Sequence, residues 1–391
     1  MVIPSFSFSR IPQIYFGAGS FDNIESIIGS QARSALIVTG ARSFKSTEKR
    51  SRLQEMLSNR SITAYDISVS GEPSPDLVDS AVAEFRGKSI DIVVSIGGGS
   101  VIDAGKAISA MLTQTVSVVD FLESVGTGIK HSGEKIPFIA VPTTAGTGSE
   151  ATKNAVLSRI GPGGFKKSLR HDNFVPDAVV IDPELIRHCP PAITAACGMD
   201  AFTQLLESYV STKANPMTDA LAYSGLSYVK DSLVEVYTGG SRSIDSWAGM
   251  AYGAFMSGIT LANAGLGIVH GLASPVGGYF DIPHGVICGT LVGPATRVTI
   301  DKLRTRGDKG MPFLRKYANV GALFTGSDNE DIHYLCDTLL KTIDEWTETL
   351  KLPSLREYGI GESDFDRIID GAGNKNNPVH LDRNEIRKIL K

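Results

Sequence analysis

Short apolar runs alternate with amphipathic helical stretches through the first half of the chain. The runs are rich in Val, Ile and Ala, and they are predicted to be strands at residues 35–39, 64–67, 91–96, 138–141 and 178–181. Apolar residues with helical spacing lie between them, as at residues 76–85 and 101–111. The runs lack strict alternation, so helices are expected on both faces of the sheet. This pattern predicts an α/β domain built on a mostly parallel sheet.

After about Asp182 the pattern changes to helical periodicity alone. Helices are predicted at residues 194–211, 216–237, 246–263 and 331–350. No run in this half has the character of a strand. We therefore predict an all-α C-terminal domain, with the boundary near residues 183–190 and the two domains spanning residues 1–185 and 186–391.

Composition and charge narrow the class of protein. With 391 residues, 42% hydrophobic and 20% charged, the chain has the make-up of a soluble globular protein with room for two domains. A net charge of −4 gives no electrostatic reason to expect nucleic acid or an anionic membrane as a partner. The four cysteines form no CxxC pair and are expected to be reduced, which favours a cytoplasmic location. The N-terminal residues lack the basic and apolar segments of a signal peptide.

Residues 246–280 contain no Asp, Glu, Lys or Arg. A run of this length could cross a membrane. It also carries eight glycines and Pro275, and no basic cluster flanks it. We therefore favour a packed helical core over a membrane span.

Two histidines lie in or near this charge-free run. His270 is expected to be buried, and burial disfavours the charged imidazolium, which leaves a neutral ring suited to binding a metal. His284 follows in an Asp-Ile-Pro-His-Gly segment, and Asp200 lies upstream on a predicted helix. One carboxylate and two imidazoles are a plausible set for a divalent metal that keeps an open coordination position.

A glycine-rich loop follows the third predicted strand. The sequence is Gly-Gly-Gly-Ser-Val-Ile-Asp, and the next residues are predicted to open a helix. Glycines allow a close backbone approach, and a helix N-terminus offers free N–H groups, so the loop could bind a pyrophosphate. An ordinary tight turn has the same appearance, and this is not the G-x-G-x-x-G that follows the first strand of a standard Rossmann domain. The candidate coenzyme residues here are Gly97, Gly98, Gly99, Ser100 and Asp103.

A second loop, residues 142–150, follows the fourth predicted strand and reads Pro-Thr-Thr-Ala-Gly-Thr-Gly-Ser-Glu. Its hydroxyl groups suit a ribose, phosphate or amide, and the candidates are Thr143, Thr144 and Thr147. Loops at the carboxyl ends of parallel strands are where open α/β sheets bind nucleotides. The two loops together indicate a nucleotide-binding domain more specifically than either does alone.

Several motifs in this order resemble the iron-containing (group III) alcohol dehydrogenase family. The motifs occupy residues 97–103, 142–150, 176–185, 198–203 and 265–285, and the resemblance covers nearly the whole chain. It implies a dehydroquinate synthase-like architecture, with an α/β nucleotide-binding domain followed by a helical domain. It further implies hydride transfer between NAD(P)H and a small aldehyde or ketone in the cleft between the domains, and a homodimer as the commonest assembly. It also assigns a coenzyme-binding role to Lys166, for which a solvated lysine is the alternative.

The chain departs from the family at one metal ligand. The resemblance implies Fe²⁺ or Zn²⁺ held by one Asp and three His, and Asp200, His270 and His284 occupy three of those positions. The fourth position is Gln204, whose amide oxygen is a poorer ligand than imidazole. The glycerol dehydrogenases are similar in using three ligands, whereas the maleylacetate reductases work without a metal. Ser274 is a second departure, since the family commonly has a proton-relaying His there.

The end of the first predicted strand bears on the coenzyme. NAD-specific enzymes usually carry an acidic residue there to accept the ribose hydroxyls. This chain has Gly40, with Arg42 and Lys45 close behind. The lost carboxylate would no longer repel a 2′-phosphate, and a cation could bind it, so NADP is favoured while NAD stays possible.

The sequence thus predicts an NAD(P)-dependent alcohol dehydrogenase or aldehyde reductase. Its catalytic centre would comprise Asp200, His270 and His284, with the metal as a Lewis acid on the oxygen of a small aldehyde or alcohol. The alternatives are a metal-free reductase resembling maleylacetate reductase, a lyase resembling dehydroquinate synthase, and a nucleotide-binding protein that has lost catalysis.

Overall fold

The computed structural model describes residues 3, 5–29, 32–161, 163–239 and 243–391. The chain divides into two compact units. An α/β unit contains residues 9–159 and 164–189, and a helical unit contains residues 190–391 together with 1–8 and 160–163.

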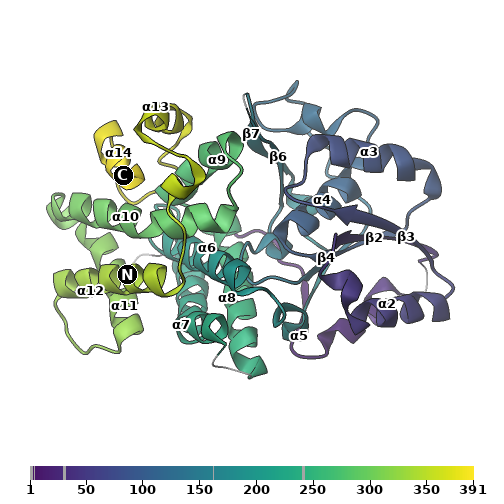
Figure 1. Ribbon diagram of the computed structural model, residues 1–391, viewed down its shortest axis with the longest axis horizontal. Coiled ribbons are helices and arrows are strands. Elements are labelled where there is room, and N and C mark those ends of the chain that lie inside the picture. Colours follow the sequence, from purple (N-terminus) through teal and green to yellow (C-terminus); the bar gives the residue numbers. More distant parts are fainter. Residues whose placement is uncertain (1–2, 4, 30–31, 162, 240–242) are drawn as a thin grey trace. The chain divides into compact units, whose positions relative to one another are not determined.

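A six-stranded parallel sheet forms the centre of the α/β unit (Figure 1). The strand order across the sheet is β1 (Gln13–Phe16), β8 (Ala178–Ile181), β5 (Phe138–Pro142), β4 (Ile92–Gly97), β2 (Ser34–Gly40), β3 (Thr63–Val69). The four inner strands are almost fully buried, whereas the edge strands β1 and β3 are partly exposed. The prediction of a mostly parallel sheet covered on both faces is confirmed.

Successive side chains of each strand point to opposite faces of the sheet, and helices cover both faces. On one face, Ile37 of β2 and Val94 of β4 join a core that includes Leu53 of α2 (Glu48–Asn59) and Ile24 of α1 (Ile24–Ile28). On the other face lies α4 (Gly99–Met111), which packs on β4, with α3 (Pro75–Phe85) beside it. Such two-sided burial explains why the inner strands are continuous apolar runs.

The strand order reverses between β2 and β4. The chain passes from β2 outward to β3 and then returns to the other side of β2 to form β4. The register pairs Thr39 with Ile96 and Gly97 with Pro142, so the loops after β2, β4 and β5 leave the same edge of the sheet. In open α/β sheets such a reversal is the usual place for a ligand.

Three strands were not predicted from the sequence. The edge strand β1 has only four residues, and β6 (Asn154–Arg159) and β7 (Phe165–Arg170) form a separate antiparallel pair. The β7 sequence Phe-Lys-Lys-Ser-Leu-Arg is half exposed and carries three cations. Such a strand lacks the apolar pattern on which the prediction depended.

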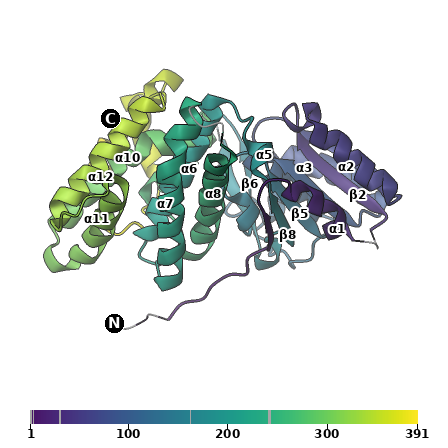
Figure 2. The same cartoon turned by 90° about the horizontal axis from the view of Figure 1, so that it is seen from below.

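Among its described residues the second unit contains helices and no strand, which confirms the predicted change of pattern. Figure 2 shows α6, α7 and α8 side by side. The helices are α6 (Pro191–Tyr209), α7 (Pro216–Thr238), α8 (Ile244–Ala264), α9 (Ile268–Tyr279), α10 (His284–Arg304), α11 (Met311–Thr325), α12 (Ile332–Thr349), α13 (Glu362–Gly371) and α14 (Arg383–Leu390). The short helix α5 (Pro183–Ile186) precedes them in the α/β unit.

The charge-free run forms α8 and α9. Glycines allow α8 to approach α7 closely, since a Cβ at Gly253 would lie 2.4 Å from Val229 and one at Gly249 would lie 2.2 Å from Ser232. Among the described residues, no single helix has the length and apolar character needed to cross a membrane. Within the described ranges, α8 and α9 reach that length and composition only when taken together, and they are bent by 100° at the break between them.

Candidate active site

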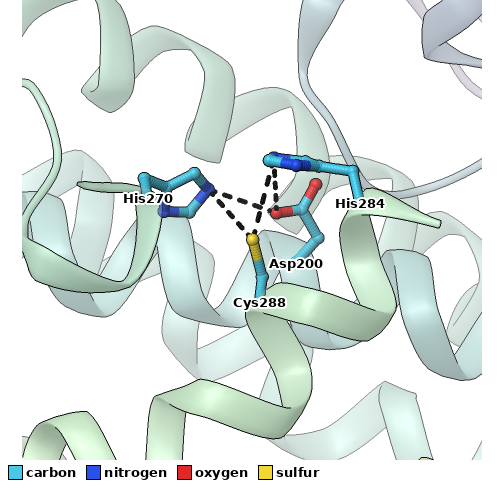
Figure 3. Close-up of side chains that lie close together, drawn as sticks. All are labelled: Asp200, His270, His284 and Cys288. Atoms are coloured by element: carbon cyan, nitrogen blue, oxygen red, sulfur yellow. Dashed lines mark hydrogen bonds and ion pairs between the residues drawn. The ribbon is translucent and has the colours of Figure 1, made fainter. Parts of the chain in front are cut away.

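Three helices of the helical unit bring the predicted metal ligands together (Figure 3). Asp200 lies in the middle of α6 and is 1% exposed. His270 lies in the first turn of α9 and is buried, as predicted. His284 is the first residue of α10, directly after Pro283, and is partly exposed.

The ligand atoms of these residues face one another. His270 Nε2 lies 3.3 Å from Asp200 Oδ1, and His284 Nε2 lies 3.9 Å from the same oxygen. The two imidazole rings have centroids 5.5 Å apart and meet edge to face. A carboxylate and two imidazole nitrogens therefore converge on one small volume.

Cys288 is a fourth member of this cluster that was not predicted from the sequence. Its sulfur lies 3.5 Å from His270 Nε2 and 3.7 Å from His284 Nε2. One potential ligand atom from each of the four residues lies within 4.8 Å of the others. The available signal was spacing, because Cys288 follows His284 by four residues and so lies one turn further on the same helix face. Burial raises the pKa of the Cys288 thiol to about 12.

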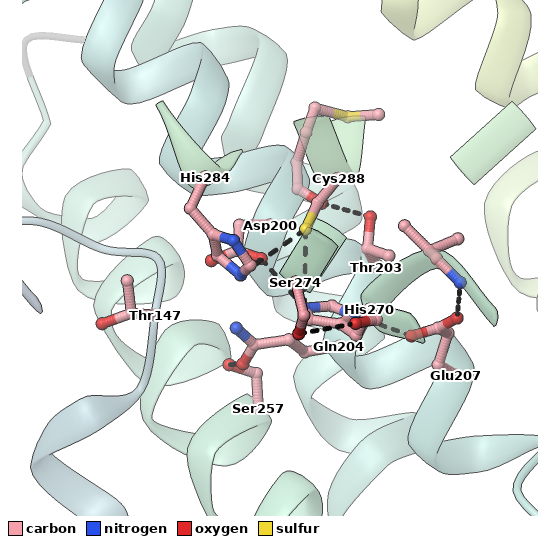
Figure 4. A network of polar contacts seen from close by, with 12 residues as sticks. Thr147, Asp200, Thr203, Gln204, Glu207, Ser257, His270, Ser274, His284 and Cys288 are labelled. Atoms are coloured by element: carbon pink, nitrogen blue, oxygen red, sulfur yellow. Dashed lines mark hydrogen bonds and ion pairs between the residues drawn. The ribbon is translucent and has the colours of Figure 1, made fainter. Parts of the chain in front are cut away.

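Glu207, about two helical turns beyond Asp200 on α6, supports His270 from behind (Figure 4). Its carboxylate accepts from His270 Nδ1 at 2.7 Å and from the backbone N–H of Val269 at 2.7 Å. The hydrogen bond keeps a proton on Nδ1 and turns Nε2 toward the cluster. A carboxylate in this position is typical of metal-binding histidines, where it fixes the ring and raises its basicity.

The charges around the cluster shift pKa values in opposite directions. Burial raises the pKa of Asp200, but His284, His270 and Cys288 lower it more, to about 2. Burial lowers the pKa of His270, but Cys288, Asp200 and Glu207 raise it well above its ordinary value. The expectation of a neutral His270 considered burial alone, whereas two buried carboxylates favour positive charge between them. A divalent cation would supply that charge in place of protons.

The two departures from the family also lie at this cluster. Gln204 is buried one turn after Asp200, and its Oε1 accepts from the Ser257 hydroxyl at 2.8 Å (Figure 4). Ser274 is partly buried, and its hydroxyl donates to the backbone oxygen of His270 at 3.3 Å. Both side chains thus hydrogen-bond within the helical unit.

The cluster fits a divalent metal ion. Its donors are one carboxylate, two imidazole nitrogens and a thiol, which suit zinc or iron better than magnesium. Asp200 Oδ2 is buried and makes no hydrogen bond within the described part of the chain. A buried carboxylate oxygen without a donor is costly unless a cation compensates it. Asp200, His270 and His284 would hold such an ion, and Cys288 lies within reach of the same point.

The glycine-rich loop lies at the reversal of strand order in the α/β unit. Gly98 is the N-cap of α4, and neither a capping side chain nor an acidic residue occupies the first turn. Two of the glycines are required by packing, because a Cβ at Gly97 would lie 2.6 Å from Val101 and one at Gly99 would lie 2.5 Å from Thr147. Ser100 follows in the first turn of α4. The free helix N-terminus is suited to an anion such as a pyrophosphate.

The hydroxyl-rich loop is tied to the glycine-rich loop. The backbone N–H of Thr143 donates to Gly97 O at 2.9 Å, and Thr144 lies against Gly98. The loop then turns at Thr147, whose Oγ1 accepts from the backbone N–H of Ser149. The structure therefore brings the two predicted coenzyme loops side by side within one unit.

Two buried charged residues of α4 hold the end of this loop. Asp103 accepts from the Ser149 hydroxyl and from the backbone N–H of Val156. Lys106 is fully buried, and its Nζ donates to the backbone oxygens of Ser149, Thr152 and Asn154 at 2.7, 3.0 and 2.6 Å. Asp103 was predicted to contact the coenzyme, but both of its carboxylate oxygens bind the protein.

The remaining candidates lie elsewhere in the α/β unit. Gly40 ends β2 at the reversal, Arg42 is exposed, and Lys45 donates to Ser68 Oγ at 3.2 Å. Lys166 lies on β7 with its Nζ 3.0 Å from the Glu72 carboxylate. Its side chain is only 11% exposed, so it is an ion-paired lysine and not the solvated lysine of the alternative interpretation.

Comparison with known proteins gives a consistent result along the chain. A family model for iron-containing alcohol dehydrogenase matches residues 12–183, and a model for the C-terminal domain of Fe-containing alcohol dehydrogenases matches residues 194–391. The chain is 32% identical to alcohol dehydrogenase 4 of Saccharomyces cerevisiae, with 97% of each chain covered. It is 30% identical to the NADPH-dependent butanol dehydrogenase of Clostridium saccharobutylicum, with 96% of this chain and 95% of the relative covered. The solved structure of a 1,3-propanediol oxidoreductase has a TM-score of 0.89 and 27% identity over 99% of both chains.

The fold, the nucleotide loops and these matches define an NAD(P)-dependent oxidoreductase that acts on small alcohols and aldehydes. The chain belongs to the iron-containing alcohol dehydrogenase family.

Proposed function

We propose that this alcohol dehydrogenase uses NADP(H) and a divalent metal held by Asp200, His270 and His284. The observation that carries the proposal is the convergence of these three side chains, from α6, α9 and α10, on one buried point. When bound there, the metal supplies Lewis acidity toward the oxygen of the substrate, and the nicotinamide supplies or accepts the hydride.

The residues of the chain would position the metal ion and the coenzyme. Glu207 holds the His270 ring by its Nδ1–H, so that Nε2 would present a lone pair to a bound metal. Asp200 is almost fully buried, which strengthens its interaction with a cation. In the α/β unit the free N-terminus of α4 and the loop hydroxyls would hold the pyrophosphate and ribose of the coenzyme.

The choice of NADP(H) rests on the end of β2. An acidic residue at this position would accept ribose hydroxyls and repel a 2′-phosphate, and Gly40 does neither. Arg42 and Lys45 follow within five residues and offer positive charge to a phosphate. These three residues support NADP(H) over NAD(H).

We further infer a homodimeric enzyme of the cytoplasm. The homodimer rests on resemblance to the family, and the cytoplasm on a sequence whose four cysteines form no CxxC pair. Light scattering coupled to size exclusion would report twice the mass of the 41.6 kDa chain.

The metal is tested by comparing His270→Ala with His333→Ala, a change at an exposed histidine of α12. We expect His270→Ala to lose both bound metal and most NADPH-dependent reduction of short aldehydes, because a ligand and the Glu207 hydrogen bond disappear together. His333→Ala should retain both. The measurement is metal content by mass spectrometry beside NADPH oxidation on the same samples. Full activity in wild-type protein shown to be free of metal would refute the metal centre.

A further inference from the structure

We infer that Cys288 supplies the fourth protein ligand of the metal centre, in place of the histidine that this chain replaces with Gln204. The inference rests on the metal centre of the proposed function and adds a sulfur donor to it. It makes the site a carboxylate–bis-imidazole–thiolate centre, a donor set softer than one carboxylate with three imidazoles.

The distances match one coordination shell (Figure 3). The Cys288 sulfur is 3.5 Å and 3.7 Å from the Nε2 atoms of His270 and His284. Asp200 Oδ1 is 3.3 Å and 3.9 Å from the same two nitrogens. Ordinary zinc bond lengths separate tetrahedral neighbours by about 3.6 Å for sulfur and nitrogen and by about 3.4 Å for nitrogen and oxygen.

The Cys288 sulfur lies beside two imidazole nitrogens at once. Without a cation it could hold both only by donating its weak S–H to one nitrogen and accepting weakly from the other. Asp200 Oδ2 adds an independent indication, since it is buried in the cluster without a hydrogen-bond donor among the described residues. A cation at the centre of the four residues satisfies both observations.

Gln204 is the poorer candidate for the fourth ligand. Its Oε1 already accepts from the Ser257 hydroxyl at 2.8 Å, and an amide oxygen carries no charge. Cys288 is fully buried and lies one turn after His284 on the rigid helix α10, so both of these donors are held by one element. The Cys288 thiolate on α10 thus takes the place of the histidine that is missing on α6.

Cobalt substitution tests the sulfur ligand directly. Metal-free protein is titrated with Co²⁺ alone, and we expect a sulfur-to-cobalt charge-transfer band in the near ultraviolet beside the visible bands of tetrahedral cobalt. Cys288→Ser should lose the charge-transfer band and weaken Zn²⁺ binding at least about tenfold in a chelator competition. The matched control is Cys336→Ser, because Cys336 is also buried but lies on α12 against Leu314 O.

A double variant tests whether the two positions compensate each other. Gln204→His in the Cys288→Ser background should restore Zn²⁺ affinity by about tenfold or more without restoring the charge-transfer band, because imidazole replaces the sulfur. This readout measures binding and does not depend on turnover.

The outcomes separate the two proposals. Stoichiometric Co²⁺ binding by wild-type protein without a charge-transfer band overturns the sulfur ligand and leaves the metal centre in place. The wild-type spectrum decides this even where Cys288→Ser does not fold. Failure of wild-type protein to bind Co²⁺ or Zn²⁺ while it reduces aldehydes overturns the metal centre itself.

Discussion

Two charged residues buried at the candidate coenzyme loops, Lys106 and Glu150, are compensated to different degrees. Lys106 donates to three backbone oxygens, and even so burial lowers its pKa to about 8. Glu150 follows Ser149 in the hydroxyl-rich loop and is 3% exposed. Burial raises the pKa of Glu150 to about 7, although Lys106 lowers it in part. Glu150 is therefore the acidic group of this loop whose ionisation opposes folding.

The raised pKa of Glu150 predicts a pH-dependent effect of Glu150→Gln. The folded state binds the proton more tightly than the unfolded state, so this contribution to stability is complete below pH 4.5 and is lost as pH rises through about 7. That interval corresponds to about 3 kcal/mol. Glutamine stays neutral, so Glu150→Gln should raise the Tm by several degrees at pH 8 and change it little at pH 5.

Thermal unfolding of wild type and variant at both pH values checks this. Glu84→Gln is the control, because Glu84 is exposed on α3 and should show no such difference. A Tm increase at pH 5 as large as that at pH 8 would mean that the effect arises from packing and not from ionisation.

At the scale of helices and strands, the sequence predicts those elements whose burial leaves a pattern of apolar residues. The inner strands and the long helices were found because their burial leaves continuous or periodic apolar runs. The edge strand β1 and the pair β6–β7 were missed because half-exposed strands tolerate charge, as the cations of β7 show. The fold class could be predicted from the pattern of apolar residues. The reversal of strand order between β2 and β4 could not, because it is defined by which strands are hydrogen-bonded to each other in the structure.

At the candidate sites, too, some residues could be predicted from the sequence and others only from the structure. Asp200, His270 and His284 were predicted from residue type, charge-free surroundings and family resemblance, and the structure brings them together. Cys288 was missed because a lone cysteine is usually a buried thiol. Its spacing places it beside His284 on α10, but only the packing of α9 on α10 brings it to His270. Glu207 was missed because nothing in the sequence joins it to His270, sixty-three residues later.

The end of β2 carries a prediction about coenzyme choice. Gly40→Asp should lower the ratio of kcat/KM for NADPH to that for NADH by about tenfold or more, since one charge-assisted hydrogen bond contributes about 1–3 kcal/mol. The backbone has room for the change, because a Cβ at Gly40 would lie 3.7 Å from Ser43 Oγ and 3.8 Å from Val101.

Gly40→Ala is the matched control, because it adds the Cβ without the charge and should leave the ratio close to that of wild type. Steady-state kinetics with both coenzymes provide the measurement. A wild-type enzyme that prefers NADH tenfold would contradict the proposed choice of NADP(H).

For the whole molecule, the division into two units separates the two proposed binding functions along the chain. Asp200, His270, His284 and Cys288 all belong to the helical unit. The loops after β2, β4 and β5 all belong to the α/β unit. Each ligand should therefore stabilise the protein through residues of one unit, by mass action on its folded state.

Ligand-induced shifts in thermal unfolding test this separation. A ligand at one hundred times its Kd stabilises by about 2.7 kcal/mol, which corresponds to roughly 5–10 °C for a unit of this size. Zn²⁺ and NADPH should each raise the unfolding temperature of wild-type protein. His270→Ala should lose the Zn²⁺ shift and keep most of the NADPH shift, because the nucleotide loops contain no residue of α9. Loss of both shifts in this variant, with its unliganded Tm unchanged, would show that the coenzyme also depends on the metal-binding unit.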